Sequence, residues 1–185
     1  MSQINDCFDS VKFKYIKDSA AVLKYDEEGR LCQCCGEKVK IFSDMGINSQ
    51  ELVEILCPKC IASGEASKKF DGYFYDLSDN LIENTEAVEE LEKRTPVLNT
   101  WKEIKWPVCC DDYCVFQKEI TTKDLDDRKF VNEVRKNYQK QSDNEKISNV
   151  IEEIDDDGTT FLLFKCGKCG KYFIIKDDDD FKENW

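Results

Sequence analysis

The 185-residue chain contains no histidine, and so it lacks the commonest general base and the usual partner of a cysteine nucleophile. It also lacks long apolar runs. The longest ones, such as Phe161 to Phe164, fall far short of the roughly 20 residues of a membrane-spanning helix. The stretch from Met1 to Asp9 has no basic region followed by an apolar one, which is the pattern of an export signal. These absences predict a cytoplasmic protein that is not an enzyme.

Basic residues are also in deficit. The 27 Lys and Arg stand against 39 Asp and Glu, which gives a formal net charge of −12. An acidic surface repels a phosphate backbone and attracts basic proteins, so nucleic acid is an unlikely partner and a basic protein is favoured. Two zinc ions, each held by four thiolates, would bring the charge to about −16. The alternative is that the excess acid only keeps the protein soluble.

Cysteine is abundant, with 11 residues. Inside a cell thiols stay reduced, so this number favours metal binding over disulfides, and the odd count agrees. Two cysteines separated by two residues form a knuckle that supplies half of a tetrahedral zinc site. Two knuckles with this spacing, separated by residues 36 to 56, are close to the pattern of a four-cysteine zinc site with roughly 15 to 20 residues between its pairs. The predicted first site is Cys32, Cys35, Cys57 and Cys60.

The remaining pairs complete a second site without any histidine. Its predicted ligands are Cys110, Cys114, Cys166 and Cys169. Both sites would hold structural Zn²⁺, because four thiolates leave no open position for water or substrate. The spare cysteines are Cys7, Cys34 and Cys109, of which Cys34 could replace Cys32 or Cys35 and Cys109 could replace Cys110. Iron, an iron–sulfur centre, free buried thiols or a redox pair remain as alternatives.

The pattern of apolar residues predicts short elements around these sites. Val39 to Phe42 and Leu52 to Leu56 are expected to form a hairpin between the first two knuckles. The near-helical spacing of the apolar residues after Cys60, interrupted by Gly64, indicates a short broken helix. Acidic residues at the start and basic residues at the end indicate a helix from Glu86 to Arg94, capped by Asn84 or Thr85. We expect a short strand near residues 13 to 16. Further along the chain we expect a long helix from Thr121 or Thr122 to about Gln141 and a shorter helix over roughly residues 145 to 154. A strand–knuckle–strand unit is expected over residues 159 to 176.

The predicted fold class is α+β, with small zinc-ribbon-like β-hairpin modules that carry four-cysteine metal sites and are combined with several helices. The chain is expected to be a single domain over residues 1 to 185. Within it, residues 28 to 70 form a zinc-ribbon-like module. Residues 97 to 185 hold the second site and a long helix near residues 121 to 141.

Several unusual motifs carry a resemblance to a known family. They occur in the family's order from Phe13 to about Asp178: FKYIKD, CQCCG, LCPKCIASGEASKKFDGYF, LEKRTP, the two tryptophans Trp101 and Trp106, CCDDYCVF and FKCGKCGKY. The chain resembles the CbrC family of bacterial proteins. It departs from the family at Lys59, Val115 and Gln117, but not at the cysteine pairs.

The resemblance implies a cytoplasmic protein linked to tolerance of a DNA-cleaving colicin, in a family without an established biochemical activity. Together with the charge, it suggests a zinc-binding protein that acts by binding another protein, a basic nuclease toxin in this hypothesis, as an immunity protein does. One alternative is a nucleic-acid-associated zinc-ribbon regulator. Another is a thiol-based enzyme or redox sensor that uses a spare cysteine such as Cys34 or Cys109.

Overall fold

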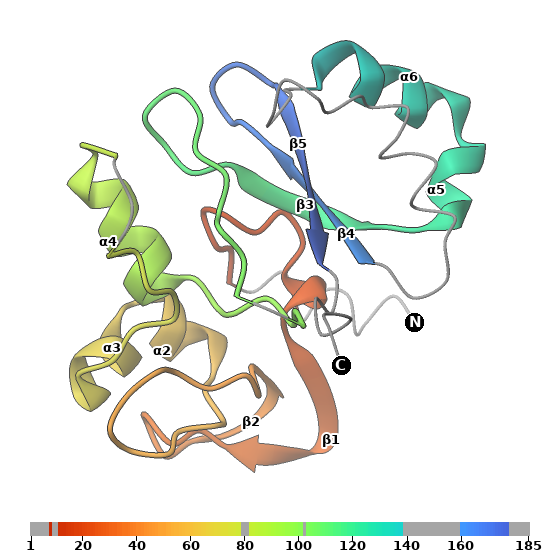
Figure 1. Cartoon of the computed structure of the whole chain (residues 1–185). Helices are drawn as coiled ribbons and strands as arrows, with labels where there is room; N and C mark the ends of the chain where they lie inside the picture. Colours follow the sequence, from red (N-terminus) through yellow and green to blue (C-terminus); the bar gives the residue numbers. More distant parts are fainter. Residues whose placement is uncertain (1–7, 9–10, 79–81, 102, 139–159, 178–185) are drawn as a thin grey trace, which may run out of the picture. The chain divides into compact units, whose positions relative to one another are not determined.

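The computed structural model describes residues 8, 11–78, 82–101, 103–138 and 160–177 (Figure 1). The chain divides into two compact units, one up to Asn99 and one from Thr100 onward. Each has its own small antiparallel sheet and helices, so the fold is α+β. The described elements are η1 (Ser19–Ala21), β1 (Lys24–Leu31), β2 (Lys38–Phe42), α2 (Pro58–Ala62), α3 (Glu65–Phe70), α4 (Thr85–Arg94), β3 (Val115–Ile120), α5 (Thr122–Asp126), α6 (Arg128–Asn137), β4 (Thr160–Lys165) and β5 (Tyr172–Asp177).

The first sheet pairs β1 with β2, so the first cysteine knuckle is the tip of a hairpin. The Cys32 amide donates to the Glu37 carbonyl at 2.9 Å, and the Gly36 amide donates to the Cys32 carbonyl at 2.7 Å. Gly36 has a φ of 77°, which a glycine adopts without steric cost. The predicted hairpin between β2 and residues 52 to 56 is therefore wrong in its partner: that segment forms no strand, and its β-bridge in the described residues joins Leu56 to Ser43.

Among the described residues of the first unit, three α-helices follow the sheet. Helix α2 begins at Pro58, directly after Cys57, and Gly64 separates it from α3 with a φ of 76°, which confirms the predicted broken helix. Helix α4 also agrees with the prediction, because the Asn84 side chain caps it by accepting a hydrogen bond from the Ala87 amide. The Ser67 hydroxyl donates to the Lys93 carbonyl at 2.8 Å and so joins α3 to α4.

The second sheet has the strand order β3–β4–β5 and is antiparallel throughout. Strands β4 and β5 flank the Cys166/Cys169 knuckle, which confirms the predicted strand–knuckle–strand unit. Helices α5 and α6 cover one face of this sheet (Figure 1). The helices and the sheet share a buried core of Ile120, Val134, Phe161, Leu163, Tyr172 and Ile174.

The predicted long helix from residue 121 is split in two at Asp127. This residue has a non-helical ψ of 94°, and its carboxylate accepts hydrogen bonds from the amides of Lys129 and Phe130. An aspartate that caps the next helix competes with the continuation of the preceding one, which explains the break. The segment near Phe13 to Ile16 is a tight turn closed by one bridge, not a strand.

Some predictions lie outside the described residues: the helix from 145 to 154, the last part of the helix predicted to 141, the acidic tail beyond Asp177, and Cys7. The domain boundaries stay a prediction. Among the described helices, none combines the length and apolar character that crossing a membrane requires.

Replacing Gly46 should destabilise the first unit. Gly46 has a φ of 69°, and a Cβ atom there would overlap the carbonyl oxygen of Val53. We expect Gly46→Ala to lower the free energy of unfolding by roughly 2 to 4 kcal/mol, measured by urea denaturation. Gly36→Ala is the matched control, because its φ is similarly positive at 77° but no atom lies within 4 Å of the added carbon. An equal loss in both variants would contradict a role for the Val53 contact.

Candidate metal centres

The first group of thiols is built from the two knuckles of the first unit. Cys32 and Cys35 lie in the turn between β1 and β2, and Cys57 and Cys60 lie at the start of α2. Their four sulfurs all lie within 4.8 Å of one another, with 4.0 Å between the Sγ atoms of Cys35 and Cys57. A tetrahedral zinc with Zn–S bonds of about 2.3 Å needs sulfurs about 3.8 Å apart. The four predicted ligands of the first site are thus brought together in a suitable arrangement.

Backbone amides point at these sulfurs. The Cys57 amide donates to the Cys32 sulfur at 3.2 Å, and the Cys60 amide donates to the Cys57 sulfur at 3.4 Å. Such bonds favour the thiolate, which is the form that binds metal. The Gln33 side chain accepts from the amides of Glu54 and Ile55, at 2.7 and 2.9 Å, and so holds the two knuckles together.

The crowded thiols of this group have divergent pKa values. Burial opposes ionisation of Cys32, but hydrogen bonds from the Cys35 and Cys57 amides outweigh it and lower the pKa of Cys32. Burial, with the charge of Cys32, raises the pKa of Cys57 to about 11 and also raises the pKa of Cys60. The thiolate of Cys32 is therefore favoured, whereas Cys57 and Cys60 keep their protons unless a cation offsets the repulsion between the charges.

The second group joins two turns of the second unit: Cys109, Cys110, Cys166 and Cys169, again with all sulfurs within 4.8 Å. The Cys109 sulfur lies 3.7 Å from that of Cys110 and 3.5 Å from that of Cys169. Cys110 has a φ of 57°, so the tight turn at this residue directs two adjacent side chains to one place. A hydrogen bond from the Lys171 amide is the main cause that lowers the pKa of Cys169 to about 7.

The structure differs from the predicted second set at one residue. Three of its members are brought together, but Cys114 lies outside the group and Cys109 occupies its place. Cys114 is fully buried, its carbonyl accepts a hydrogen bond from the Trp106 indole at 2.7 Å, and burial raises the pKa of its thiol to about 12. The spacing in the sequence favoured Cys110 and Cys114 as the ligand pair. The adjacent residues Cys109 and Cys110 can both join the group because of a left-handed turn, and spacing alone does not reveal such a turn.

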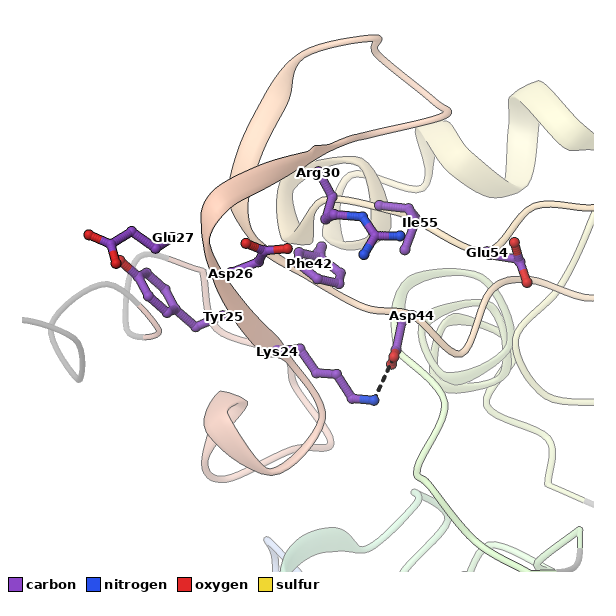
Figure 2. Close-up of a pocket in the computed structure, with 9 residues that line it drawn as sticks. All are labelled: Lys24, Tyr25, Asp26, Glu27, Arg30, Phe42, Asp44, Glu54 and Ile55. Atoms are coloured by element: carbon purple, nitrogen blue, oxygen red, sulfur yellow. Dashed lines mark ion pairs between the residues drawn. The ribbon is translucent and has the colours of Figure 1, made fainter.

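A groove on the first unit was not anticipated from the sequence. It has a volume of about 560 Å³ and lies beside β1 and β2 (Figure 2). Lys24, Asp26 and Arg30 lie on the side of β1 that faces Phe42, whereas Tyr25 and Glu27 point away (Figure 2). Lys24 pairs with Asp44 at 2.5 Å, and the Arg30 guanidinium lies 5.8 Å from the centre of the Phe42 ring.

Two carboxylates of this groove are available to a cation. Asp26 and Glu54 form no ion pair with any residue in the part of the chain that the structure describes. Glu54 is exposed and Asp26 is half-buried. The groove therefore offers free negative charge beside an aromatic ring and a single unpaired guanidinium.

Comparison with known proteins gives one family. A family model described as "Uncharacterised protein family (UPF0167)" matches residues 11–178. A UPF0167 protein of Pseudomonas aeruginosa is 30% identical over 118 residues, which cover 61% of this chain and 65% of that protein's length. UPF0167 proteins of Mycobacterium bovis and Mycobacterium tuberculosis are each 30% identical over 135 residues, which cover 69% of this chain and 71% of theirs. The chain thus spans just under two thirds of the Pseudomonas protein. No solved structure matches it.

The ligand choice at the second site can be decided by two single variants. We expect Cys109→Ser to lose one bound metal ion per chain, because its sulfur belongs to the group of four. We expect Cys114→Ser to keep the full metal content, although it disturbs a buried position. Elemental analysis of the purified variants measures both. The opposite pattern, with metal lost only in Cys114→Ser, would restore the pair Cys110 and Cys114 as ligands.

Proposed function

The chain belongs to the UPF0167 family, and from this premise we propose that it is a non-enzymatic protein held together by two structural Zn²⁺ ions, which acts by binding another protein. The observation that carries the proposal is the grouping of thiols in two sets of four. Zinc takes four sulfur ligands in a tetrahedron, so each set fills the coordination sphere and leaves no position for a substrate. Soft thiolate ligands with no histidine or carboxylate favour zinc over magnesium, calcium or manganese.

The chemistry proposed for the partner is basic. The net charge of −12 would become about −16 with two ions bound, and such a charge speeds the encounter with a basic protein. The groove beside β1 and β2 supplies a place for contact, because Asp26 and Glu54 can each accept a lysine or arginine side chain. The motifs that resemble the CbrC family suggest which kind of basic protein the partner is. The partner we propose is a basic nuclease toxin, bound in the cytoplasm.

One observation favours the nucleic-acid alternative. Helix α6 buries Val134 and exposes the opposite face, on which lie Arg128, Lys129, Arg135 and Lys136. None of these four cations forms an ion pair with a described residue. A stripe of free cations along one helix is typical of a phosphate-binding surface. The overall charge opposes this function, so it ranks second.

Metal removal should unfold both units. Each site joins chain segments that are distant in sequence, so metal binding contributes folding free energy directly. We expect Cys57→Ser and Cys166→Ser each to lose about one ion per chain and to lower the melting temperature by roughly 5 to 10 °C or more. Differential scanning calorimetry with elemental analysis measures both effects. An unchanged melting temperature in either variant would contradict a structural role for that site.

The partner's chemistry can be tested with an arginine-rich peptide titrated into the full chain. We expect binding that weakens as salt rises, and weakens about tenfold in the double variant Asp26→Asn/Glu54→Gln, because two charge contacts are lost. The control, Glu37→Gln/Glu51→Gln, removes the same charge from exposed positions outside the groove.

An equal loss in both double variants would contradict a contact in the groove, and binding unaffected by salt would contradict electrostatic steering. The same titration with a DNA duplex tests the alternative. Retention of DNA at low salt that disappears in Arg135→Gln/Lys136→Gln would favour nucleic acid as the partner.

A further inference from the structure

The two groups of thiols differ in how far solvent reaches them. Three of the four cysteines of the first group are buried, and the exposed one is Cys35. In the second group Cys166 alone is buried, at 2% exposed, whereas Cys110 and Cys169 are exposed and Cys109 is half-buried. Oxidation of a cysteine follows its accessibility. A small oxidant in solution therefore reaches the sulfurs of the second group more readily than those of the first.

The sulfurs of the second group also lie close enough to form a disulfide. The Cys109 sulfur is 3.5 Å from that of Cys169 and 3.7 Å from that of Cys110. Consecutive Cα atoms are about 3.8 Å apart, which is shorter than the roughly 4.4 to 6.8 Å between the Cα atoms of an unstrained disulfide. This disfavours a bond between the neighbours Cys109 and Cys110. Cys109 and Cys169 are therefore the favoured pair.

A bond between Cys109 and Cys169 would join the same two turns that a metal ion joins. The turns are also held together by a contact that does not involve the sulfurs, because the Lys168 ammonium donates a hydrogen bond to the Cys110 carbonyl at 2.8 Å. The disulfide can thus form while the two turns stay in place. It would replace the cross-link that is lost when the ion leaves.

We propose that the second centre is a site of reversible oxidation by a hydroperoxide, at which a disulfide forms between Cys109 and Cys169 and the zinc ion is released. This inference rests on the proposed zinc binding and adds a modification site to it. The two thiolates that remain, Cys110 and Cys166, fill only half of a tetrahedral site, so the ion leaves.

The oxidation proceeds in two steps with hydrogen peroxide as the oxidant. The exposed Cys169 sulfur attacks one peroxide oxygen, the O–O bond breaks, and the hydroxide that leaves takes a proton to become water. The Cys109 sulfur then attacks the resulting sulfenic acid of Cys169. The S–S bond forms as the S–O bond breaks, and the second hydroxide also becomes water. The two sulfurs lose two electrons in total, and the peroxide gains them.

The modification is tested on the zinc-loaded full chain, treated with hydrogen peroxide in the absence of reductant. We expect one ion per chain to be released about tenfold faster than the other, as measured with a colorimetric zinc indicator against an untreated sample. Peptide mass spectrometry after alkylation of the remaining thiols should find a disulfide between Cys109 and Cys169. Dithiothreitol and added zinc should then restore two ions per chain.

Two variants separate the centres, because each lacks one of the two ions. The ion left in Cys57→Ser belongs to the second centre and should be released at the fast rate of the unaltered protein. The ion left in Cys166→Ser belongs to the first centre and should be released about tenfold more slowly. If either variant does not fold, the alkylation pattern of the unaltered protein decides, since it reports oxidation at each cysteine.

Equal rates of release from the two centres would overturn the proposal, because exposure would then not control the oxidation. A disulfide between any other pair of cysteines would overturn the assigned pair, and peroxide that releases no zinc would overturn the oxidation site as a whole. Failure of the zinc proposal itself is distinguishable, because the protein would then contain no zinc before the treatment.

Discussion

We propose that the fold depends on the need of each cysteine knuckle for a partner knuckle around a metal ion. One turn supplies two sulfurs, and a tetrahedral ion requires four, so segments that are distant along the chain must meet. In the first unit this brings the β1–β2 turn to the start of α2. In the second it brings the turn at Cys109 and Cys110 to the loop between β4 and β5. The short strands and helices bury modest cores around these points, and a bound ion would supply much of the stability that such small cores lack.

The sequence predicted the structure correctly where a feature follows from the residue type itself, such as a thiol that can bind metal or a side chain that caps a helix. The spacing of Cys32, Cys35, Cys57 and Cys60 predicted a group that the structure assembles, and Asn84 and Gly64 predicted where helices begin and break. It was insufficient where backbone geometry decides. A left-handed turn at Cys110 brings in Cys109 in place of Cys114, and the capping carboxylate of Asp127 divides one predicted helix into α5 and α6. Neither feature has a periodicity or a spacing that reveals it.

Strand pairing and surface chemistry were equally hidden from the sequence. β2 pairs with β1 because the first knuckle is itself a hairpin turn, so the segment before Cys57 is left with a single bridge to Ser43. The groove beside β1 and β2 and the exposed cations of α6 likewise depend on which side chains the folded backbone brings together. The net charge of −12 is a sum over the whole chain, so it does not show where acidic and basic side chains gather on the surface.

The measurement that tests this account most directly is the metal content of the untagged, unaltered protein, determined by elemental analysis alongside native mass spectrometry. Two closed sites predict close to two zinc ions per chain, retained through purification. Two zinc ions per chain would support a function that depends on binding at the folded surface, because the thiols would then be occupied by metal. A protein that folds stably with no metal, or that contains iron in place of zinc, would contradict the account, because its thiols would then be available for redox chemistry.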